Sequence, residues 1–199
     1  MNARVAAAAD LETVVEILTL AFTDDPVWGR TLRNPGGQPE EMADFWRLWV
    51  QGALRYPWVW VWNEGEATSV WIPPGGTEMS AEQEKEFSRL ATSRLGEGRA
   101  AYLAQVMAAF DATHPHSEPH YYLSLLATHP AHRGRGVGMA LLADNLARID
   151  REGMPAYLES SNPANDHRYE RLGFKPVDKF QLPEDGPIIT TMWRAARIA

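Results

Sequence analysis

Apolar residues near the N-terminus recur at the three- and four-residue spacing of a helix face. They are Leu11, Val14, Val15, Leu18 and Phe22. Asp10 precedes them at the position of an N-cap, and Pro26 ends or redirects the helix. Similar spacing predicts helices over residues 40–55 and 98–110. Ser80 and Gln83 form a capping box, which predicts that another helix follows.

Other segments have the pattern of strands. Tryptophan and valine alternate over 58–62, and a turn at 63–66 leads back into residues 67–72, which predicts a hairpin. Residues 4–8 predict a first edge strand, and further strands are expected at 121–128, 156–160, 175–181 and 188–194. Strands alternate with helices at the centre, with hairpins at both ends. This order predicts an α/β fold with a mixed sheet.

The segment Arg133–Gly138 has a glycine at every second position and lies between a predicted strand and a predicted helix. A turn of this kind at the start of a helix leaves backbone N–H groups unpaired, and the helix dipole adds partial positive charge. Such a helix start binds phosphate groups. Arg133 and Arg135 add formal charge suited to phosphate oxygens. The segment therefore predicts a phosphate-binding turn, with an ordinary strand–turn–helix connection as the alternative.

Two common nucleotide motifs do not fit this turn. Leu141 stands where the last glycine of the dinucleotide pattern G-x-G-x-x-G belongs, and no acidic residue closes a following strand. The ATP-binding loop requires a lysine after its glycines, and none follows here.

A second motif lies beyond the glycine turn. Residues 165–174 spell N-x-x-x-Y-E-x-x-G-F, after a predicted strand that ends at Asn162 and a proline at the first helical position. Together with R-x-x-G-x-G at 133–138, this pair of motifs resembles the Gcn5-related N-acetyltransferase (GNAT) superfamily. Segments 21–26, 67–74, 118–123 and 158–174 resemble a narrower branch, the puromycin N-acetyltransferases.

The resemblance implies a fold and an activity. The expected fold is a mixed central sheet of about six to seven strands, flanked by helices and splayed at the core strand, in one N-acetyltransferase domain over residues 1–199. The expected activity is direct transfer of acetyl from acetyl-CoA to a primary amine of a small molecule in a ternary complex. The alternatives are a protein N-terminal or lysine acetyltransferase, and a CoA-binding module without catalysis.

The same resemblance assigns the residues that hold acetyl-CoA. The pyrophosphate would be bound by Arg133, Gly134, Arg135, Gly136, Val137, Gly138 and Met139, mainly through backbone N–H groups. The pantetheine arm would pair with main-chain groups of the core strand at Leu126, Ala127 and Thr128, as an added strand would. Asn165 would also touch the pantetheine, with a purely structural role as the alternative for it and for Asn162.

The catalytic assignments follow from what amine acetylation requires. Tyr169 matches the tyrosine that protonates the departing thiolate, with core packing as its alternative role. The base that deprotonates the amine would be Glu159, His120 or Tyr122. Glu159 could instead bind a cationic amine or be only a strand-end charge. Asn162 is an N-cap by position.

The acceptor pocket is expected from the early helices and from the loop before the core strand. Its candidate residues are Asp24, Asp25, Trp28, Trp46 and Trp49. Aromatic walls with a carboxylate suit an aromatic or cationic amine. For Trp46, Trp58 and Trp60 a place in the core is the competing prediction.

Composition narrows the partners. The 199 residues are 45% hydrophobic and 23% charged, which is typical of a globular protein with a sizeable core. A net charge of −7 with no basic tract argues against nucleic acid and is compatible with a cationic acceptor. No histidine has a zinc-like spacing, so no metal is predicted.

Features that the sequence lacks restrict the expected cellular compartment and the possible covalent reaction intermediates. It contains no cysteine, which excludes an acetyl-cysteine intermediate and a disulfide framework. We expect a cytoplasmic monomer or homodimer, since no apolar run is long enough for a membrane span and no secretory signal begins the chain.

Overall fold

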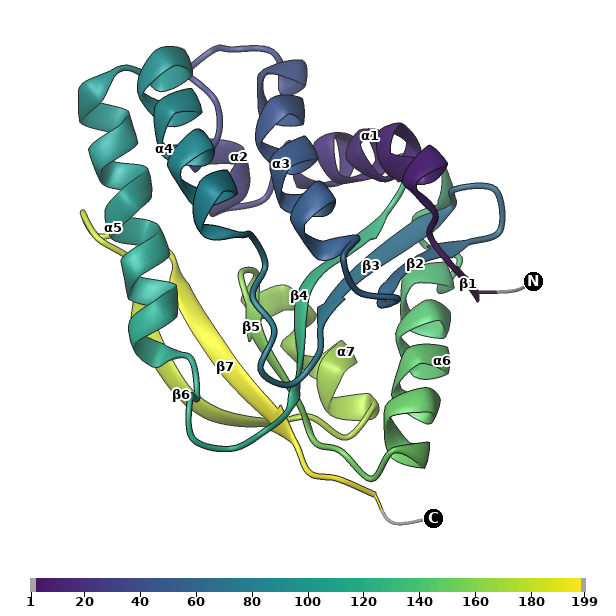
Figure 1. The fold of residues 1–199 in the computed structure, drawn as a ribbon. Coiled ribbons are helices and arrows are strands. Elements are labelled where there is room, and N and C mark those ends of the chain that lie inside the picture. Colours follow the sequence, from purple (N-terminus) through teal and green to yellow (C-terminus); the bar gives the residue numbers. More distant parts are fainter. Residues whose placement is uncertain (1–2, 198–199) are drawn as a thin grey trace.

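A computed structural model describes residues 3–197, and their seven strands form one sheet in the order β1-β2-β3-β4-β5-β7-β6 (Figure 1). The strands are β1 (Ala3–Val5), β2 (Val59–Trp62), β3 (Ala67–Ile72), β4 (Tyr121–Thr128), β5 (Ala156–Ser160), β6 (Lys175–Gln181) and β7 (Ile188–Arg194). The pair β4–β5 is parallel and the others are antiparallel. The mixed sheet expected from the sequence is confirmed.

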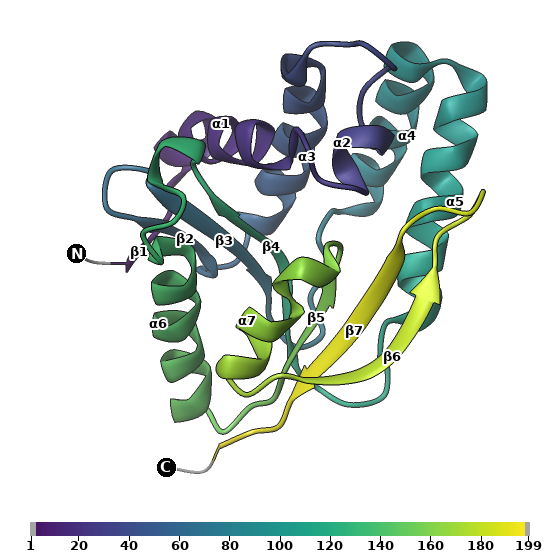
Figure 2. The ribbon, with the colours of Figure 1, turned by 180° about the vertical axis from the view of Figure 1, so that it is seen from behind.

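Helices pack against both faces of this sheet. They are α1 (Leu11–Phe22), α2 (Trp28–Thr31), α3 (Ala43–Ala53), α4 (Ala81–Leu95), α5 (Glu97–Thr113), α6 (Val137–Arg151) and α7 (Asp166–Arg171). One buried cluster joins the sheet to α1, α3, α4 and α5, and a second joins it to α6 and α7. In the view from behind, α7 lies in front of the sheet (Figure 2).

The alternation along β2 assigns its side chains to these two clusters. Val59 and Val61 belong to the cluster under α1 and α3, whereas Trp60 and Trp62 belong to the cluster under α6. Successive side chains of a strand point to opposite faces, so a strand covered on both sides can be apolar throughout. Trp58 and Trp60 are buried at 9% and 5% exposure, which confirms their predicted place in the core.

Most predicted elements agree with the structure, and the differences are local. The capping box forms, with the Gln83 amide donating to Ser80 Oγ at 3.3 Å. The first strand, predicted over 4–8, ends at Val5. The Asp10 carboxylate accepts from the Ala7 amide at 2.8 Å instead of capping α1, and this contact begins a short turn over Ala8–Asp10. Helix α5 continues to Thr113, beyond the predicted end at 110.

The sheet splays between β4 and β5. Their pairing covers three positions and ends at Leu123 opposite Leu158. Beyond that point β4 continues along β3 as far as Thr128, while β5 continues along β7 as far as Ser160. Within the described residues, the β5-facing edge of β4 beyond Leu123 therefore has no strand partner. The splay at the core strand is confirmed.

Residues 3–197 contain no helix with the length and apolar character needed to cross a membrane.

Candidate functional site

The glycine turn presents backbone at the start of α6. Gly134 and Gly136 have φ values of 78° and 74°, in the left-handed region that favours glycine. A Cβ atom on Gly138 would lie 2.4 Å from Thr128 Oγ1, so the helix start packs directly on the end of β4. The glycines therefore allow the turn to form and place it beside the splayed strand.

The first amides of α6 have no acceptor within the helix. The first hydrogen bond of α6 runs from the Ala140 amide to the Gly136 carbonyl at 2.9 Å, so the amides of Val137, Gly138 and Met139 lie outside the helical ladder. Arg133 is exposed and donates to the Ala21 carbonyl at 2.8 Å, and exposed Arg135 lies 2.8 Å from His132 Nδ1. These features fit a phosphate group at the helix start.

A small cleft of about 70 Å³ lies where β4 and β5 separate. Its lining includes Ser124 and Leu126 of β4, Glu159 of β5, and Asn165 and Tyr169 at α7. The open edge of β4 also includes Ala127 and Thr128, whose side chains alternate between buried and half-buried. Two of the predicted pantetheine residues, Leu126 and Asn165, thus line one cleft with the predicted proton donor Tyr169.

Tyr169 is half-buried, with its ring edge toward Phe174 at 6.3 Å. Burial, together with the charges of Asp25 and Asp166, raises the pKa of Tyr169 to about 12. The phenol is therefore protonated at neutral pH, as a proton donor must be. The Asn162 side chain accepts from the Ala164 amide at 3.1 Å, so this residue is the predicted cap.

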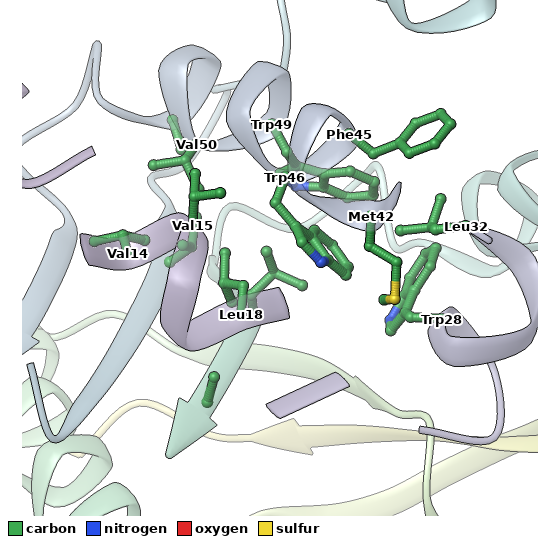
Figure 3. Packing of buried hydrophobic residues seen from close by; sticks show 14 of the residues in the cluster. Val14, Val15, Leu18, Trp28, Leu32, Met42, Phe45, Trp46, Trp49 and Val50 are labelled. Carbon is green, nitrogen blue, oxygen red and sulfur yellow. The ribbon is translucent and has the colours of Figure 1, made fainter. Parts of the chain in front are cut away.

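The residues predicted for the acceptor pocket are divided between a cleft and the core: Asp25 and Trp28 line the small cleft, whereas Trp46 and Trp49 do not. Trp46 and Trp49 are buried in the core at 0% and 2% exposure (Figure 3). Asp24 is exposed, and Asp25 accepts from the Val27 and Trp28 amides and from Ser161 Oγ. The tryptophans fill the space between α1, α2 and α3 because the helix faces that bear them pack together.

A larger cavity of about 1170 Å³ lies elsewhere, beside α4 and α5 and at the ends of β4 and β5. Apolar side chains such as Phe87, Leu103 and Met107 form part of its wall. Its carboxylates are Glu78, Glu84, Glu97, Asp111, Glu118 and Glu159. Within the described chain, no lysine or arginine lines it, so its potential favours cations.

Glu159 stands at the inner end of this cavity with its side chain 2% exposed. Its Oε1 atom is buried, makes no hydrogen bond within the described residues, and lies 3.5 Å from His114 Nδ1. His114 Nε2 lies 3.3 Å from His120 Nε2, and His120 Nδ1 lies 2.6 Å from the Glu118 carbonyl oxygen. Burial lowers the pKa of His120.

Two tyrosines surround the same carboxylate. Burial raises the pKa of Tyr122 well above its ordinary value, and the charge of Glu159 adds to the shift. The pKa of Tyr157 is raised for the same reasons. Tyr122 therefore stays protonated at neutral pH, which is unfavourable for the base role considered for it from the sequence.

Glu78 is a second carboxylate of the cavity. Its Oε1 accepts from Ser124 Oγ at 2.6 Å, and Trp49 Nε1 donates to the same hydroxyl at 3.1 Å. Burial raises the pKa of Glu78 to about 7 despite the hydrogen bond from Ser124. The sequence analysis did not identify Glu78 or His114, because both lie in loops without a motif.

Cavity and cleft meet at a single side chain. Among the described residues, Glu159 alone lines both of them. One end of the site is thus the small cleft where β4 and β5 separate, and the other is an acidic cavity.

Comparisons with known proteins agree with this geometry. The acetyltransferase (GNAT) domain description matches residues 97–176, which contain both sequence motifs. An uncharacterised N-acetyltransferase of Schizosaccharomyces pombe is 24% identical over 194 residues, covering 93% of this chain and 78% of the relative.

Solved structures share the fold. A structure from Corynebacterium glutamicum, described as histone acetyltransferase HPA2 and related acetyltransferase, is 26% identical, with a TM-score of 0.69 and coverage of 100% of this chain and 97% of the other. The Drosophila melanogaster polyamine N-acetyltransferase, which forms N-acetylagmatine, is 15% identical, with a TM-score of 0.65 and coverage of 98% and 99%. Residues 97–176 therefore match the GNAT acetyltransferase domain, and the chain as a whole shares the fold of these acetyltransferase structures.

Proposed function

We propose that this protein transfers the acetyl group of acetyl-CoA to the primary amine of a small cationic molecule, by direct attack in a ternary complex. The observation that carries the proposal is the position of Glu159, which lines both the small cleft where β4 and β5 separate and the acidic cavity. An amine in the cavity would meet a thioester in the cleft at this carboxylate.

The cleft side of the site fits acetyl-CoA, which supplies the acetyl group as an activated thioester. The amides from Gly134 to Met139 would bind its pyrophosphate, because they lie at a helix start where no intrahelical acceptor exists. Leu126, Ala127 and Thr128 would pair with the pantetheine through the open edge of β4. Asn165 lines the same cleft and is assigned to the pantetheine as well.

Tyr169 would protonate the departing thiolate. Its phenol lines the cleft, and its pKa of about 12 keeps the proton in place until it is needed. Phe174 and the backbone around α7 hold the ring in position.

Glu159 would take a proton from the acceptor ammonium. Its side chain is 2% exposed and its Oε1 atom is free of hydrogen bonds within the described residues, so a cationic amine would satisfy a buried charge there. The other five carboxylates of the cavity would attract the same cation over a longer range.

Two finer assignments are also proposals. The four segments that resemble puromycin N-acetyltransferases support membership of that branch, although the cavity wall here is built from α4 and α5 rather than from tryptophans. All residues of the chain would act as one N-acetyltransferase domain, because one sheet extends from β1 to β7.

A protein lysine or N-terminus is the second candidate acceptor. The observation in its favour is the cavity volume of about 1170 Å³, which is larger than most small-molecule pockets, at about 300–1,000 Å³. An extended substrate could occupy the additional space.

An amine panel with thiol detection tests the proposal. The panel should include agmatine, monoamines and diamines of graded length, arylalkylamines, and peptides with a lysine or a free N-terminus. We expect CoA release and a mass gain of one acetyl group with a small cationic amine. Activity confined to peptides would support the second candidate. Binding of acetyl-CoA by calorimetry without any turnover would indicate a non-catalytic module.

A further inference from the structure

We infer that His114 receives the proton that Glu159 removes from the acceptor ammonium, and that His120 holds the His114 ring in the tautomer that accepts it. The inference rests on the proposed function and adds a residue that no sequence motif or comparison assigns. His114 follows the last residue of α5, and His120 precedes the first residue of β4.

The hydrogen-bond pattern determines both tautomers. A carbonyl oxygen only accepts, so His120 Nδ1, at 2.6 Å from the Glu118 carbonyl, must bear a hydrogen. Burial lowers the pKa of His120, so the ring is neutral and its Nε2 atom presents a lone pair. His114 Nε2, 3.3 Å away, must therefore donate to it.

This tautomer leaves a lone pair on His114 Nδ1. That atom faces Glu159 Oε1 at 3.5 Å. Two acceptors facing each other repel, and a proton between them turns the contact into a charge-assisted hydrogen bond. A proton that arrives on Glu159 thus has an acceptor on the neighbouring ring, already oriented toward it.

The other neighbours of Glu159 are poorer acceptors. The rings of Tyr122 and Tyr157 pack edge-on against His114 at 4.8 and 5.1 Å, and their raised pKa values keep both phenols protonated. They can donate to Glu159 but cannot take its proton. Glu78 is the competing acceptor, and its Oε1 is occupied by the Ser124 hydroxyl.

The proton balance is complete without another reactant. An N–H bond of the ammonium breaks and an O–H bond forms on Glu159. The freed electron pair of the amine forms a C–N bond at the acetyl carbonyl, and the C–S bond of the thioester breaks. Tyr169 protonates the departing thiolate, and the second proton lost from nitrogen replaces the one that Tyr169 gave. The O–H proton then passes to His114 Nδ1, which restores the carboxylate and yields an imidazolium. The His114 side chain is 23% exposed at the cavity, so the imidazolium can release one proton to water.

Glutamine variants of two histidines test the assignment with the best acceptor of the amine panel. His114→Gln should lower kcat by about 100-fold or more with KM for the amine within about threefold, because the proton acceptor is lost while the cavity is retained. His167→Gln is the control, because that side chain is exposed and lines neither the cavity nor the cleft. Its kcat should change less than about twofold, as for surface substitutions generally.

Two further variants separate proton transfer from loop packing. Added imidazole should restore kcat of His114→Ala in a saturable manner. His120→Gln offers an amide oxygen to His114 Nε2 and should retain more kcat than His120→Leu, which offers none.

A readout without turnover is the tautomer state by ¹⁵N NMR of the protein alone. We expect hydrogen on Nδ1 of His120 and on Nε2 of His114. The inference is overturned if His114→Gln has the same kcat as an active wild type. It is also overturned if Glu78→Gln lowers kcat and His114→Gln does not, or if His120 bears its hydrogen on Nε2. A wild type that acetylates no amine overturns the proposed function instead, and the NMR result still tests the tautomers.

Discussion

The cleft and the cavity on either side of Glu159 are built from different parts of the chain. The cleft side depends on backbone groups: the left-handed glycines 134 and 136, the amides at the start of α6, and the open edge of β4. The cavity side depends on side chains from α4, α5, two loops and β5. Backbone chemistry requires particular residues at fixed spacing, whereas a side-chain cavity can be assembled from many sequences. The first region is therefore visible as a motif and the second is not.

The largest expected effect tests the cleft as the place of the departing thiolate. Tyr169→Phe removes the proton donor and should lower kcat by about 10²–10⁴-fold, with KM for acetyl-CoA little changed. Steady-state thiol release measures both constants. Tyr102→Phe on α5 is the control, since that tyrosine lies away from the cleft, and it should behave as wild type. Full activity in Tyr169→Phe would remove the phenol from the mechanism.

Glu159→Gln tests whether the residue shared by the cleft and the cavity serves catalysis or cofactor binding. It keeps the shape of the side chain but removes the charge, so kcat should fall by about 100-fold or more, as for a lost general base. Calorimetry should find acetyl-CoA binding close to wild type. If cofactor binding fell while kcat remained, Glu159 would belong to the cleft alone.

Gly138→Ala tests whether close packing positions the phosphate turn. The added Cβ would lie 2.4 Å from Thr128 Oγ1, so the helix start must shift. We expect about 1–3 kcal/mol of lost stability, typical of overpacking, and a higher KM for acetyl-CoA. Denaturant unfolding measures the stability change.

A second substitution controls this experiment. Thr128→Ala removes the opposing oxygen, so the double variant should recover most of the loss. Gly98→Ala, where the new Cβ meets nothing within 4 Å, should leave stability unchanged or slightly raised. Equal losses in the single and double variants would contradict the packing argument.

Glu78 provides a pH test of the cavity side. Its pKa is raised from 4.5 to about 7 by burial, so the folded state holds this proton more tightly than the unfolded state. The associated stability is fully present below pH 4.5 and is lost as pH rises toward 7, with a slope of at most about 1.4 kcal/mol per pH unit. Glu78→Gln should lack this slope in thermal unfolding at graded pH. If stability changed with pH in the same way in both proteins, the pKa of Glu78 would be the same in the folded and unfolded states.

The smallest expected effect concerns the carboxylates at the cavity rim. Glu84, Glu97, Asp111 and Glu118 are exposed, so salt screens their attraction for a cation over about 8–10 Å. KM for a cationic amine should rise a few-fold with ionic strength, and less steeply in Glu97→Gln. KM for acetyl-CoA serves as the internal comparison. An amine KM that is independent of salt would show that the rim charges contribute little to binding.

The sequence predicted the elements that local rules control. The predicted bounds of β4, β5, β6 and β7 agree with the structure, and α4 begins where its capping box stands. Asp10 shows where the N-cap rule fails. Its carboxylate accepts hydrogen bonds from Arg4 and from the Ala7 amide, and its side chain therefore does not cap α1. The tryptophans show a second limit. A tryptophan is compatible with a pocket wall and with a core. Only the packing of α1, α2 and α3 places Trp46 and Trp49 in the core.

The sequence by itself determined the mixed sheet and the glycine turn, because each follows from the order of elements or from backbone requirements. The expected place of Tyr169 at the cofactor came from the resemblance to the acetyltransferases. Only the tertiary structure decided where the cavity lies and which side chains meet at Glu159. His114 reaches Glu159 across 45 residues of chain and Glu78 reaches Ser124 across 46. Contacts of that kind depend on how helices and strands pack, and no local pattern of residues encodes them.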